Sequence, residues 1–466
     1  VQNFAGAGTS GAETHPDLNE YGFFAQDDWR VNPKLTLNLG LRYDVQDLAA
    51  PTVNNPSAAL AAAGLSTTTS VSDNNNFGPR FGFSYGFDEK TVVRGGYGIF
   101  FGRTTAIMLG TSHSQNGIQV TGVSLTCTTL PANPCLTYPN IFTSPPSAGT
   151  LTPSLYLFAN DYEQPYVQQG RLGIEREVFK NTSLSATYLY FRGVHLSRTR
   201  DINLAAPVST TLTDPASQTF TVLRHPAARP IPGFARINLF ESTANSRYHG
   251  LALELKRRFT RGLQFIAAYT LSDTKDDRPD QTMVVVGTDD FKGLQNNLDI
   301  RSDWGRSDLD IRHRFVFSPV YEIGRRGEDG WTRALLSNWT FSSIITLQSG
   351  FAYSALITGD ANRDGNTATD RVSGTERNQF TTPSIYIFDG RITKSFQFGE
   401  KYNLSFIAEG FNLFNRSNIA TVNTGRYVIA SNSATTLTNP PPSTPFGAAR
   451  TFLGERQIQL GVRFKF

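Results

Sequence analysis

Charged residues are scarce in this sequence. Aspartate, glutamate, lysine and arginine together make up 18% of the 466 residues, below the roughly 25% that is usual for soluble globular proteins. The 43 basic and 39 acidic residues leave a net charge of only +4, spread along the chain. This charge is too small and too dispersed for a nucleic-acid-binding surface. Aromatic residues reach 12%, which argues against a disordered chain.

Long apolar runs are also missing. The uncharged stretch at residues 334–359 is interrupted repeatedly by serine, threonine, asparagine and glutamine. It is therefore no spanning helix, which needs about 20 apolar residues. Helical periodicity is absent throughout. Residues 1–6 contain neither the basic nor the apolar region of a secretion signal, so we expect either a processed chain or one that starts within a longer protein.

What the sequence does contain is alternation with a period of two. Successive side chains of a β-strand point to opposite faces, so alternating apolar and polar residues predict strands with one apolar face. The clearest ribbons are residues 35–43 and 457–466, and similar ones occupy residues 251–255, 263–271, 315–323, 339–347, 386–396 and 402–412. Aromatic residues gather at the strand ends, as at the two water interfaces of a membrane barrel. The strands are about ten residues long, as a tilted strand needs to cross a bilayer.

Short and long connections alternate along the chain. Short turns lie at residues 31–34, 88–90, 180–181, 260–262 and 399–401, with a medium link at 324–338; long connections cover residues 45–76, 102–165, 193–246, 273–311, 351–384 and 415–450. Compact soluble domains seldom contain so many long loops. Outer-membrane barrels have short periplasmic turns and long extracellular loops. The sequence therefore predicts an all-β fold, a transmembrane antiparallel β-barrel with about thirteen strands.

The odd strand count has a consequence for the ends of the chain. With Phe466 on the periplasmic side, the first strand, residues 21–29, runs toward the periplasm. Residues 1–20 are then expected to be the end of an extracellular loop, and residues 21–466 the C-terminal part of a barrel. Bacterial single-chain barrels have even strand numbers, and an unpaired strand edge in lipid costs several kcal/mol per backbone group. We therefore expect further strands, on the same or a separate chain.

Several segments resemble the barrel of TonB-dependent outer-membrane receptors. They are residues 21–30 (YGFFAQDDWR), 35–44 (LTLNLGLRYD), 76–83 (NFGPRFGF), 166–169 (YVQQ) and 456–466 (RQIQLGVRFKF). The long loops and residues 310–315 (DIRHRF) look most like the Oar-like branch. The resemblance covers nearly all predicted strands and few of the loops.

The resemblance implies a barrel of about 22 strands with an N-terminal plug whose box engages TonB, and this sequence shows neither plug nor box. The implied function is energy-coupled uptake of an unidentified ligand, with peptides or proteins suggested by analogy only, across the outer membrane of a Gram-negative bacterium. The implied partners are outer-membrane lipid and lipopolysaccharide, the missing N-terminal segment, TonB through that segment, and an extracellular ligand. The alternative is a surface adhesion or assembly protein anchored by its barrel; a soluble lectin-like β-protein is less favoured.

Residues 360–370 (DANRDGNTATD) form the most distinctive local motif. Side-chain oxygens at alternate positions around a glycine match the first half of a calcium loop. The second half differs, because Arg371 stands where an EF-hand has its bidentate glutamate, so Asp370 would have to serve. No cofactor is required, but we expect a structural Ca²⁺ in this extracellular loop, with ligands Asp360, Asn362, Asp364, Asn366 and Asp370. The alternative is a solvated turn rich in Asp, Asn and Gly.

The two cysteines, Cys127 and Cys135, lie close together in the long loop after residue 101. Such a pair in an exported protein predicts a disulfide formed in the oxidising periplasm. A pair of free thiols is the alternative.

Catalytic motifs are weak. Residues 82–86 (GFSYG) fit the serine-hydrolase elbow, but that elbow requires a strand-to-helix turn, and here the serine falls within an alternating strand. The six histidines show no zinc-binding spacing. We therefore expect no enzyme activity.

Three groups of side chains remain as candidates for contacts with the surroundings. Arg312, His313 and Arg314 could contact lipopolysaccharide phosphates or a substrate, although a solvated loop edge is the favoured interpretation. Charged residues on the polar strand faces should line a wet interior; they are Arg42, Arg94, Arg171, Glu175, Glu254, Lys256, Glu409 and Arg463. The last strand carries the alternating outer-membrane assembly signal, formed by Leu460, Val462, Phe464 and Phe466.

Overall fold

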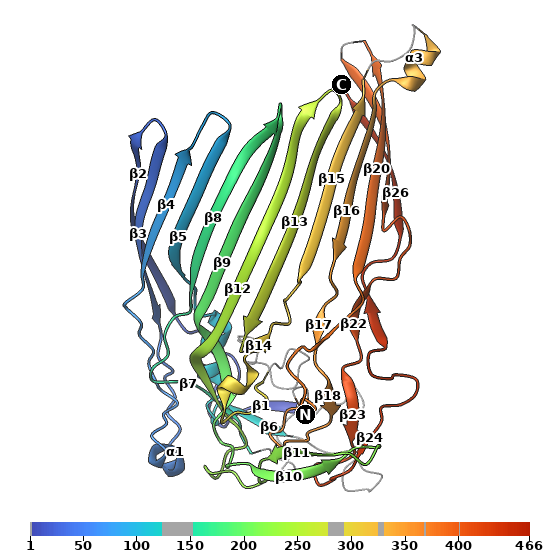
Figure 1. The fold of residues 1–466 in the computed structure, drawn as a ribbon. Coiled ribbons are helices and arrows are strands. Elements are labelled where there is room, and N and C mark those ends of the chain that lie inside the picture. Colours follow the sequence, from blue (N-terminus) through green and yellow to red (C-terminus); the bar gives the residue numbers. More distant parts are fainter. Residues whose placement is uncertain (1, 124–151, 278–292, 325–329, 368–369, 400) are drawn as a thin grey trace.

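The computed structural model describes residues 2–123, 152–277, 293–324, 330–367, 370–399 and 401–466. Thirteen strands, each antiparallel to the next, form one large curved sheet in the order in which they follow along the chain (Figure 1). They are β2 (Leu18–Asn32), β3 (Leu35–Leu48), β4 (Phe77–Gly86), β5 (Thr91–Phe101), β8 (Tyr166–Phe179), β9 (Thr182–Asp201), β12 (Ile237–Thr260), β13 (Leu263–Asp276), β15 (His313–Ile323), β16 (Trp339–Gln348), β20 (Ile385–Phe398), β21 (Tyr402–Phe411) and β26 (Gln457–Lys465). The predicted all-β fold and its strand count are confirmed.

Tight hairpins lie at one end of this sheet and long connections at the other (Figure 1). The turns after β8 and β12 need a left-handed backbone, which Asn181 (φ 64°) and Gly262 (φ 79°) supply. The medium link between β15 and β16 contains α3 (Trp331–Leu336). The predicted alternation of short and long connections is therefore present in the structure.

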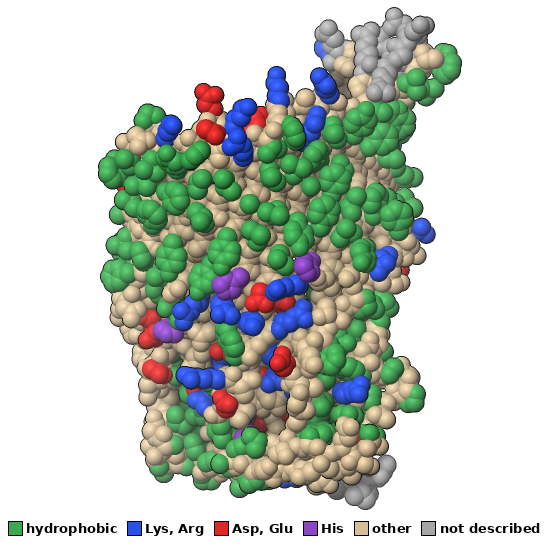
Figure 2. Space-filling model, in the orientation of Figure 1, with side chains coloured by type: hydrophobic (Ala, Val, Ile, Leu, Met, Phe, Trp, Pro, Cys, Tyr) green, Lys and Arg blue, Asp and Glu red, His purple; other side chains and the backbone are tan. Residues whose placement is uncertain are grey.

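The strand register places apolar side chains side by side on one face of the sheet. Leu251 lies opposite Tyr188 on one neighbouring strand and opposite Leu271 on the other. Phe406 lies opposite Val462 in the same way. Because directly opposite residues share a face, these rows join into the apolar band visible in Figure 2, and charged residues flank the band on both sides. The other face of the sheet carries the polar half of each alternation.

The loop end has structure of its own. It contains β1 (Gln2–Ala5) with β6 (Val120–Val123), β10 (Val208–Thr213) with β11 (Thr219–Arg224), β17 (Ala352–Tyr353) with β19 (Phe380–Thr381), β22 (Ile419–Val422) with β25 (Ala449–Phe452), and β18 (Leu356–Thr358) with β23 (Gly425–Ile429) and β24 (Leu437–Thr438). Strands β7 (Leu155–Phe158) and β14 (Gly305–Arg306) extend the main sheet from β12 and β13. The small sheets show that these connections are folded, which their irregular sequences do not reveal.

Short helices also occur at the loop end, although no helical periodicity was found in the sequence. They are α1 (Ala58–Ala62), α2 (Ala106–Ser114) and the 3₁₀ turn η1 (Ile300–Asp303). Each is too short for its apolar side chains to repeat over several turns. None of the helices in the described ranges is long and apolar enough to cross a membrane.

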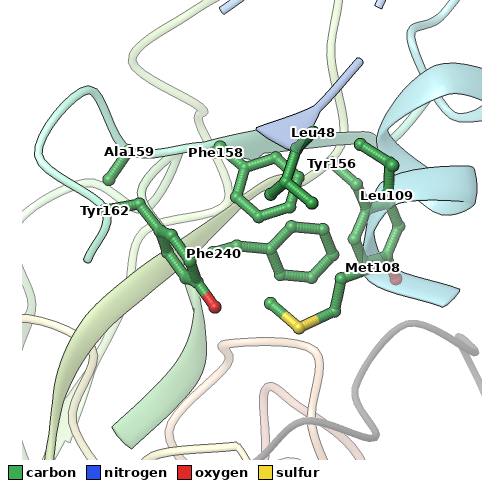
Figure 3. Packing of buried hydrophobic residues seen from close by; sticks show 8 residues of the cluster. All are labelled: Leu48, Met108, Leu109, Tyr156, Phe158, Ala159, Tyr162 and Phe240. Atoms are coloured by element: carbon green, nitrogen blue, oxygen red, sulfur yellow. The ribbon is translucent and has the colours of Figure 1, made fainter. Parts of the chain in front are cut away.

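Buried apolar residues pack between the loops and the extended strands. In one of these clusters, Phe240 of β12 lies among Tyr156 and Phe158 of β7 and Met108 of α2 (Figure 3). The ring centroid of Phe240 lies 5.8 Å from that of Tyr156 and 5.1 Å from that of Phe158. This packing fixes β7 and α2 on the extension of β12.

Two strands are much longer than the ten residues expected from the sequence. Strand β9 has 20 residues and β12 has 24, so residues 193–201 and 237–246, predicted as loop, belong to strands. Their outer parts carry Arg198, Glu241 and other buried polar residues, which interrupt the alternation that marks the membrane-facing parts.

The sheet is open. Within the described residues, β2 pairs only with β3 and β26 pairs only with β21. Phe23 and Phe24 of β2, which point to opposite faces, are 64% and 71% exposed. Both faces of this edge strand therefore lack neighbours, as expected for part of a larger barrel. The assignment of residues 1–20 to an extracellular loop stays a prediction.

Candidate functional site

Residues 360–367 follow β18 at the loop end and form a compact turn, beside which Asp370 is also buried. Its backbone takes left-handed conformations at Arg363 (φ 62°) and Gly365 (φ 84°). The amide of Gly365 donates to Asp360 Oδ2 over 3.1 Å, and the amide of Asp364 donates to Asn362 Oδ1 over 2.9 Å. All five predicted Ca²⁺ ligands are less than 9% exposed. The segment is therefore not the solvated turn that was the alternative.

Three carboxylates of this turn are close enough to affect one another. Burial, with added repulsion from the nearby Asp360, raises the pKa of Asp364 to about 7. Burial likewise raises the pKa of Asp370 to about 8, with added repulsion from Asp364 and Asp360. Asp370 Oδ2 accepts a hydrogen bond from the Ala361 amide over 2.6 Å. Oδ1 of Asp370 and Oδ1 of Asp360 are buried and accept no hydrogen bond.

Other loop segments contact this turn through its backbone. Arg224 Nε donates to Ala361 O over 2.9 Å, and the His225 amide donates to Asn362 O over 2.8 Å. The Gln295 carbonyl accepts from Asn362 Nδ2 over 3.2 Å. From a third segment, Asn432 Nδ2 donates to Asp360 Oδ2 over 3.3 Å. The turn therefore lies where segments from four loops meet.

The three residues proposed for lipopolysaccharide contact do not act together. Arg314 lies opposite Thr270 and faces the polar side of the sheet, whereas His313 lies opposite Leu271 on the apolar side. Arg312 pairs with Asp273 over 3.1 Å. The structure therefore disperses this predicted cluster, because neighbouring strand residues alternate between faces.

A different basic cluster lies at the loop-side border of the apolar band. Arg192 of β9 lies directly opposite Arg247 of β12, which in turn lies opposite Lys275 of β13. These residues share the face of Tyr188 and Leu251. Arg192 and Arg247 also line a surface depression that includes Arg301 and Trp304. No sequence pattern indicates this cluster, since its members come from four separate segments.

The polar face of the sheet has the character predicted for a wet interior. The register places all eight predicted residues on it, opposite other residues of that face; for example, Arg171 lies opposite Leu189 and Gly96. Arg94 pairs with Glu175 over 2.8 Å, and Arg391 pairs with Glu409 over 3.1 Å. Such a wall can remain hydrated and pass a polar solute.

The remaining sequence-predicted positions fall into three groups. Cys127 and Cys135 lie outside the described residues, so the disulfide stays a prediction. Ser84 lies within β4, opposite Thr36 and Arg94, and no helix follows it directly, as the elbow would require. Leu460, Val462, Phe464 and Phe466 are 56–93% exposed, and the first three lie on the apolar face of the edge strand β26.

Comparison with known proteins identifies a family model and several solved structures that are similar to this chain. Residues 2–375 match the family model described as outer membrane beta barrel domain. Among solved structures, the outer membrane transporter YddB from Escherichia coli has a TM-score of 0.52 at 11% identity, over 96% of this chain and 45% of that chain. A mutant of the ferric enterobactin receptor PfeA from Pseudomonas aeruginosa has a TM-score of 0.52 at 12% identity, over 96% of this chain and 45% of that chain. No curated protein matches.

At these identities the similarity to solved structures shows the fold alone. The chain spans less than half the length of either similar structure, in agreement with the open edges of its sheet. The apolar band is the surface that such strands turn toward hydrocarbon. The chain therefore belongs to the outer membrane beta-barrel domain family and lies in the outer membrane.

Proposed function

We propose that this chain is the C-terminal part of the barrel of a TonB-dependent transporter of the Oar-like branch. The observation that carries the proposal is the open sheet of thirteen strands, with an apolar outer face, a charged inner face and two edge strands without outer partners. Further strands and a plug, supplied by the same or another chain, would complete it. The fold similarity to the transporter YddB supports the same conclusion.

The geometry suggests how such a protein would work. The folded loop end forms the first surface that an extracellular ligand meets. The paired charges of the inner wall, such as Arg94 with Glu175, keep the interior hydrated once a ligand enters. The plug would close this path until TonB pulls on it, using energy from the inner membrane. Every step that needs the plug depends on chain outside this structure.

The ligand class is a separate proposal. One of the proteins with a similar fold is named as a ferric enterobactin receptor, so ferric siderophores are the first class to test. Peptides and proteins are the class suggested by the sequence resemblance, and they form the second. Specificity would depend on loop residues, for which the strands give no code.

Two measurements test the proposal on the complete protein. Purified full-length protein should bind the periplasmic domain of TonB in a pull-down, and deletion of its TonB-binding box should abolish that binding. Cells expressing the protein should take up radiolabelled ferric enterobactin, or a labelled peptide pool, only when TonB is present. Absence of TonB binding would overturn energy coupling, whereas binding without uptake of either probe would overturn only the ligand classes.

The alternative is a surface adhesion or assembly protein whose barrel is only an anchor. The observation that favours it is the internally packed loop end, with its small sheets and clusters of buried residues such as Leu212 and Ile357. A rigid surface of this kind suits binding to a large partner. An anchor needs no plug, so attachment of cells to a partner surface that persists without TonB would favour this alternative.

A further inference from the structure

We propose that the turn formed by residues 360–367, together with Asp370, binds one Ca²⁺ ion, which holds four extracellular loops together. The proposal rests on the position of the turn and its oxygen atoms and does not depend on transport. Its starting point is the pair of carboxylate oxygens, Asp360 Oδ1 and Asp370 Oδ1, that are buried and accept no hydrogen bond. Asp360 is only 8% exposed and Asp370 only 1% exposed.

Such atoms are costly without a ligand. A buried carboxylate that lacks a compensating partner is strongly disfavoured, and here a third carboxylate, Asp364, adds repulsion to both. A cation between them would remove the repulsion and supply the missing partner.

The available donors suit Ca²⁺ better than other metals. Calcium takes about six to eight oxygen ligands from carboxylates, amides and backbone carbonyls in a flexible geometry. The turn offers three carboxylates and the amide side chains of Asn362 and Asn366, all buried. It lacks the His and Cys ligands that zinc prefers. Mg²⁺ would demand a stricter octahedron and keep more of its water.

The structure also shows that the proposed ligands are not yet gathered around one point. In the described part of the chain, no three His, Cys, Asp or Glu side chains already make a metal-binding group. Asp364 Oδ1 accepts a hydrogen bond from the Asn366 amide over 2.6 Å, as an Asx turn does. Ca²⁺ is therefore expected to bind first to the carboxylates of Asp360 and Asp370. The side chain of Asp364 then rotates toward the ion, and the backbone conformation of the turn does not change.

Nearby arginines do not take the place of the cation. Arg224 Nε and a terminal nitrogen of Arg236 donate to the carbonyls of Ala361 and Gly365. Arg236 also lowers the pKa of Asp360 and Asp364, but burial is the larger effect on each. These guanidinium groups hold the outside of the turn and leave the two oxygens described above without a partner.

The consequence of binding reaches beyond the turn. Its backbone and side chains contact His225, Gln295 and Asn432, which belong to three other loops. Fixing the turn would therefore restrain the loop end as a whole. Extracellular calcium modules typically bind in the 10⁻⁴–10⁻³ M range, and we expect about that affinity here.

The test uses full-length protein, purified in detergent, freed of lipopolysaccharide and treated with chelator. Isothermal titration with CaCl₂ should show one site that is absent in Asp360→Asn and Asp370→Asn. Limited proteolysis should cut the loop end roughly tenfold more slowly with millimolar Ca²⁺ than with chelator. Asp214→Asn is the matched control, because Asp214 is also an Asx-turn aspartate but accepts hydrogen bonds on both oxygens.

Asp370→Asn also tests whether the substitution has opposite effects on protease resistance without and with Ca²⁺. Without Ca²⁺ this variant should resist protease at least as well as the unsubstituted protein, because asparagine cannot take up the negative charge that burial and the neighbouring carboxylates disfavour at this position. With Ca²⁺ it should gain no protection, whereas the unsubstituted protein and Asp214→Asn should. Equal protection by Ca²⁺ in all three proteins, or no titration heat in the unsubstituted protein, would overturn the proposal.

A second, independent observation concerns the outer face. We propose that Arg192, Arg247 and Lys275 bind the phosphate groups of lipopolysaccharide. They lie directly opposite one another on three neighbouring strands, and like charges in such positions destabilise a sheet unless something compensates them. Arg247 Nε is buried and lacks a hydrogen-bond partner. An anion bound between these three side chains would reduce the repulsion between them and would accept a hydrogen bond from Arg247 Nε.

The position of this row fits that ligand. It borders the apolar band on the loop side, where Figure 2 shows basic side chains gathered just beyond the hydrophobic surface. Arg301 and Trp304 line the adjoining depression, and the Trp304 ring lies 6.0 Å from the Arg247 guanidinium carbon. An aromatic ring beside guanidinium groups at a membrane interface suits a phosphate headgroup with its acyl chains on the band below.

The test compares bisphosphorylated lipid A with lipid A from which the phosphates have been removed. Full-length protein in detergent should bind the bisphosphorylated form roughly tenfold more tightly, measured by native mass spectrometry, and Arg192→Gln with Arg247→Gln should remove the difference. Arg257→Gln is the control, on the same strand and face but toward the hairpin end. Equal binding of both lipids, or an unchanged preference in the double variant, would overturn the proposal. Inorganic phosphate alone should not compete; if it does, the site is a general anion site.

Discussion

Arg198 Nη2 lies 2.7 Å from Asp277 Oδ1, and both side chains are almost completely buried at the loop end. A buried pair of this kind is costly to break on one side, because the remaining charge is left without compensation. Arg198→Met should therefore lower the stability of the loop end by about 3–5 kcal/mol. Arg198→Met combined with Asp277→Leu should recover most of that loss. Hydrogen exchange of β9 and β12 would measure both effects, and a double variant as unstable as Arg198→Met would contradict this account.

The same aspartate predicts a pH dependence. Burial raises the pKa of Asp277, although Arg198 acts in the opposite direction. A carboxyl whose pKa is higher in the folded state stabilises the fold when protonated, and this contribution is lost as the pH rises through the folded pKa. Asp277→Asn should therefore gain stability relative to the unsubstituted protein as the pH rises from about 4 upward. Melting curves across this range provide the measurement, with the more exposed Asp273→Asn as the control.

The cluster in Figure 3 makes a packing prediction. Phe240 is 0% exposed, and its replacement by alanine would leave a cavity between β7 and β12. Such substitutions cost about 3–5 kcal/mol, which should make residues 155–162 the first segment to be cut by protease. Phe259→Ala, at a position that is 50% exposed, should leave cleavage there unchanged. Equal cleavage in both variants would show that this cluster does not hold β7 in place.

The C-terminal strand makes a prediction about assembly. Phe464 stacks on Tyr402 with ring centroids 5.9 Å apart, and Phe466, which is 93% exposed, stacks on Phe464 with ring centroids 6.1 Å apart. Deletion of Phe466 from the full-length protein should therefore change its folded stability little. It should nevertheless lower the amount that reaches the outer membrane, if the residue is part of an assembly signal. Heat-modifiable mobility of membrane fractions would measure this, with Phe398→Ala as the control for loss of an exposed ring.

The membrane-crossing part of the fold could be predicted from the sequence because lipid imposes a simple rule. Leu251 and Leu253 are apolar for the same reason, namely that both face hydrocarbon, and every strand repeats this alternation. The same rule correctly assigned Arg94 and Glu175 to the inner wall. Outside the membrane the rule no longer applies. The extensions of β9 and β12 carry buried polar residues, such as Arg198 and Glu241, and their sequence does not distinguish them from loop.

The candidate sites differ in the same way. The turn at residues 360–370 could be recognised because its oxygen-bearing residues are neighbours in sequence. Arg192, Arg247 and Lys275 could not, since only the register of three strands brings them together. Arg312, His313 and Arg314 are neighbours in sequence as well, yet the register turns His313 and Arg314 to opposite sides of the strand.

The unequal strand lengths have a mechanical consequence. The 24 residues of β12 extend for roughly 80 Å along the strand, while the apolar band of such a barrel is only about 25 Å tall. Paired with β9, β12 therefore rises far above the bilayer as a stiff stalk. It therefore carries β7 and the cluster around Phe240 beyond the apolar band on a rigid support.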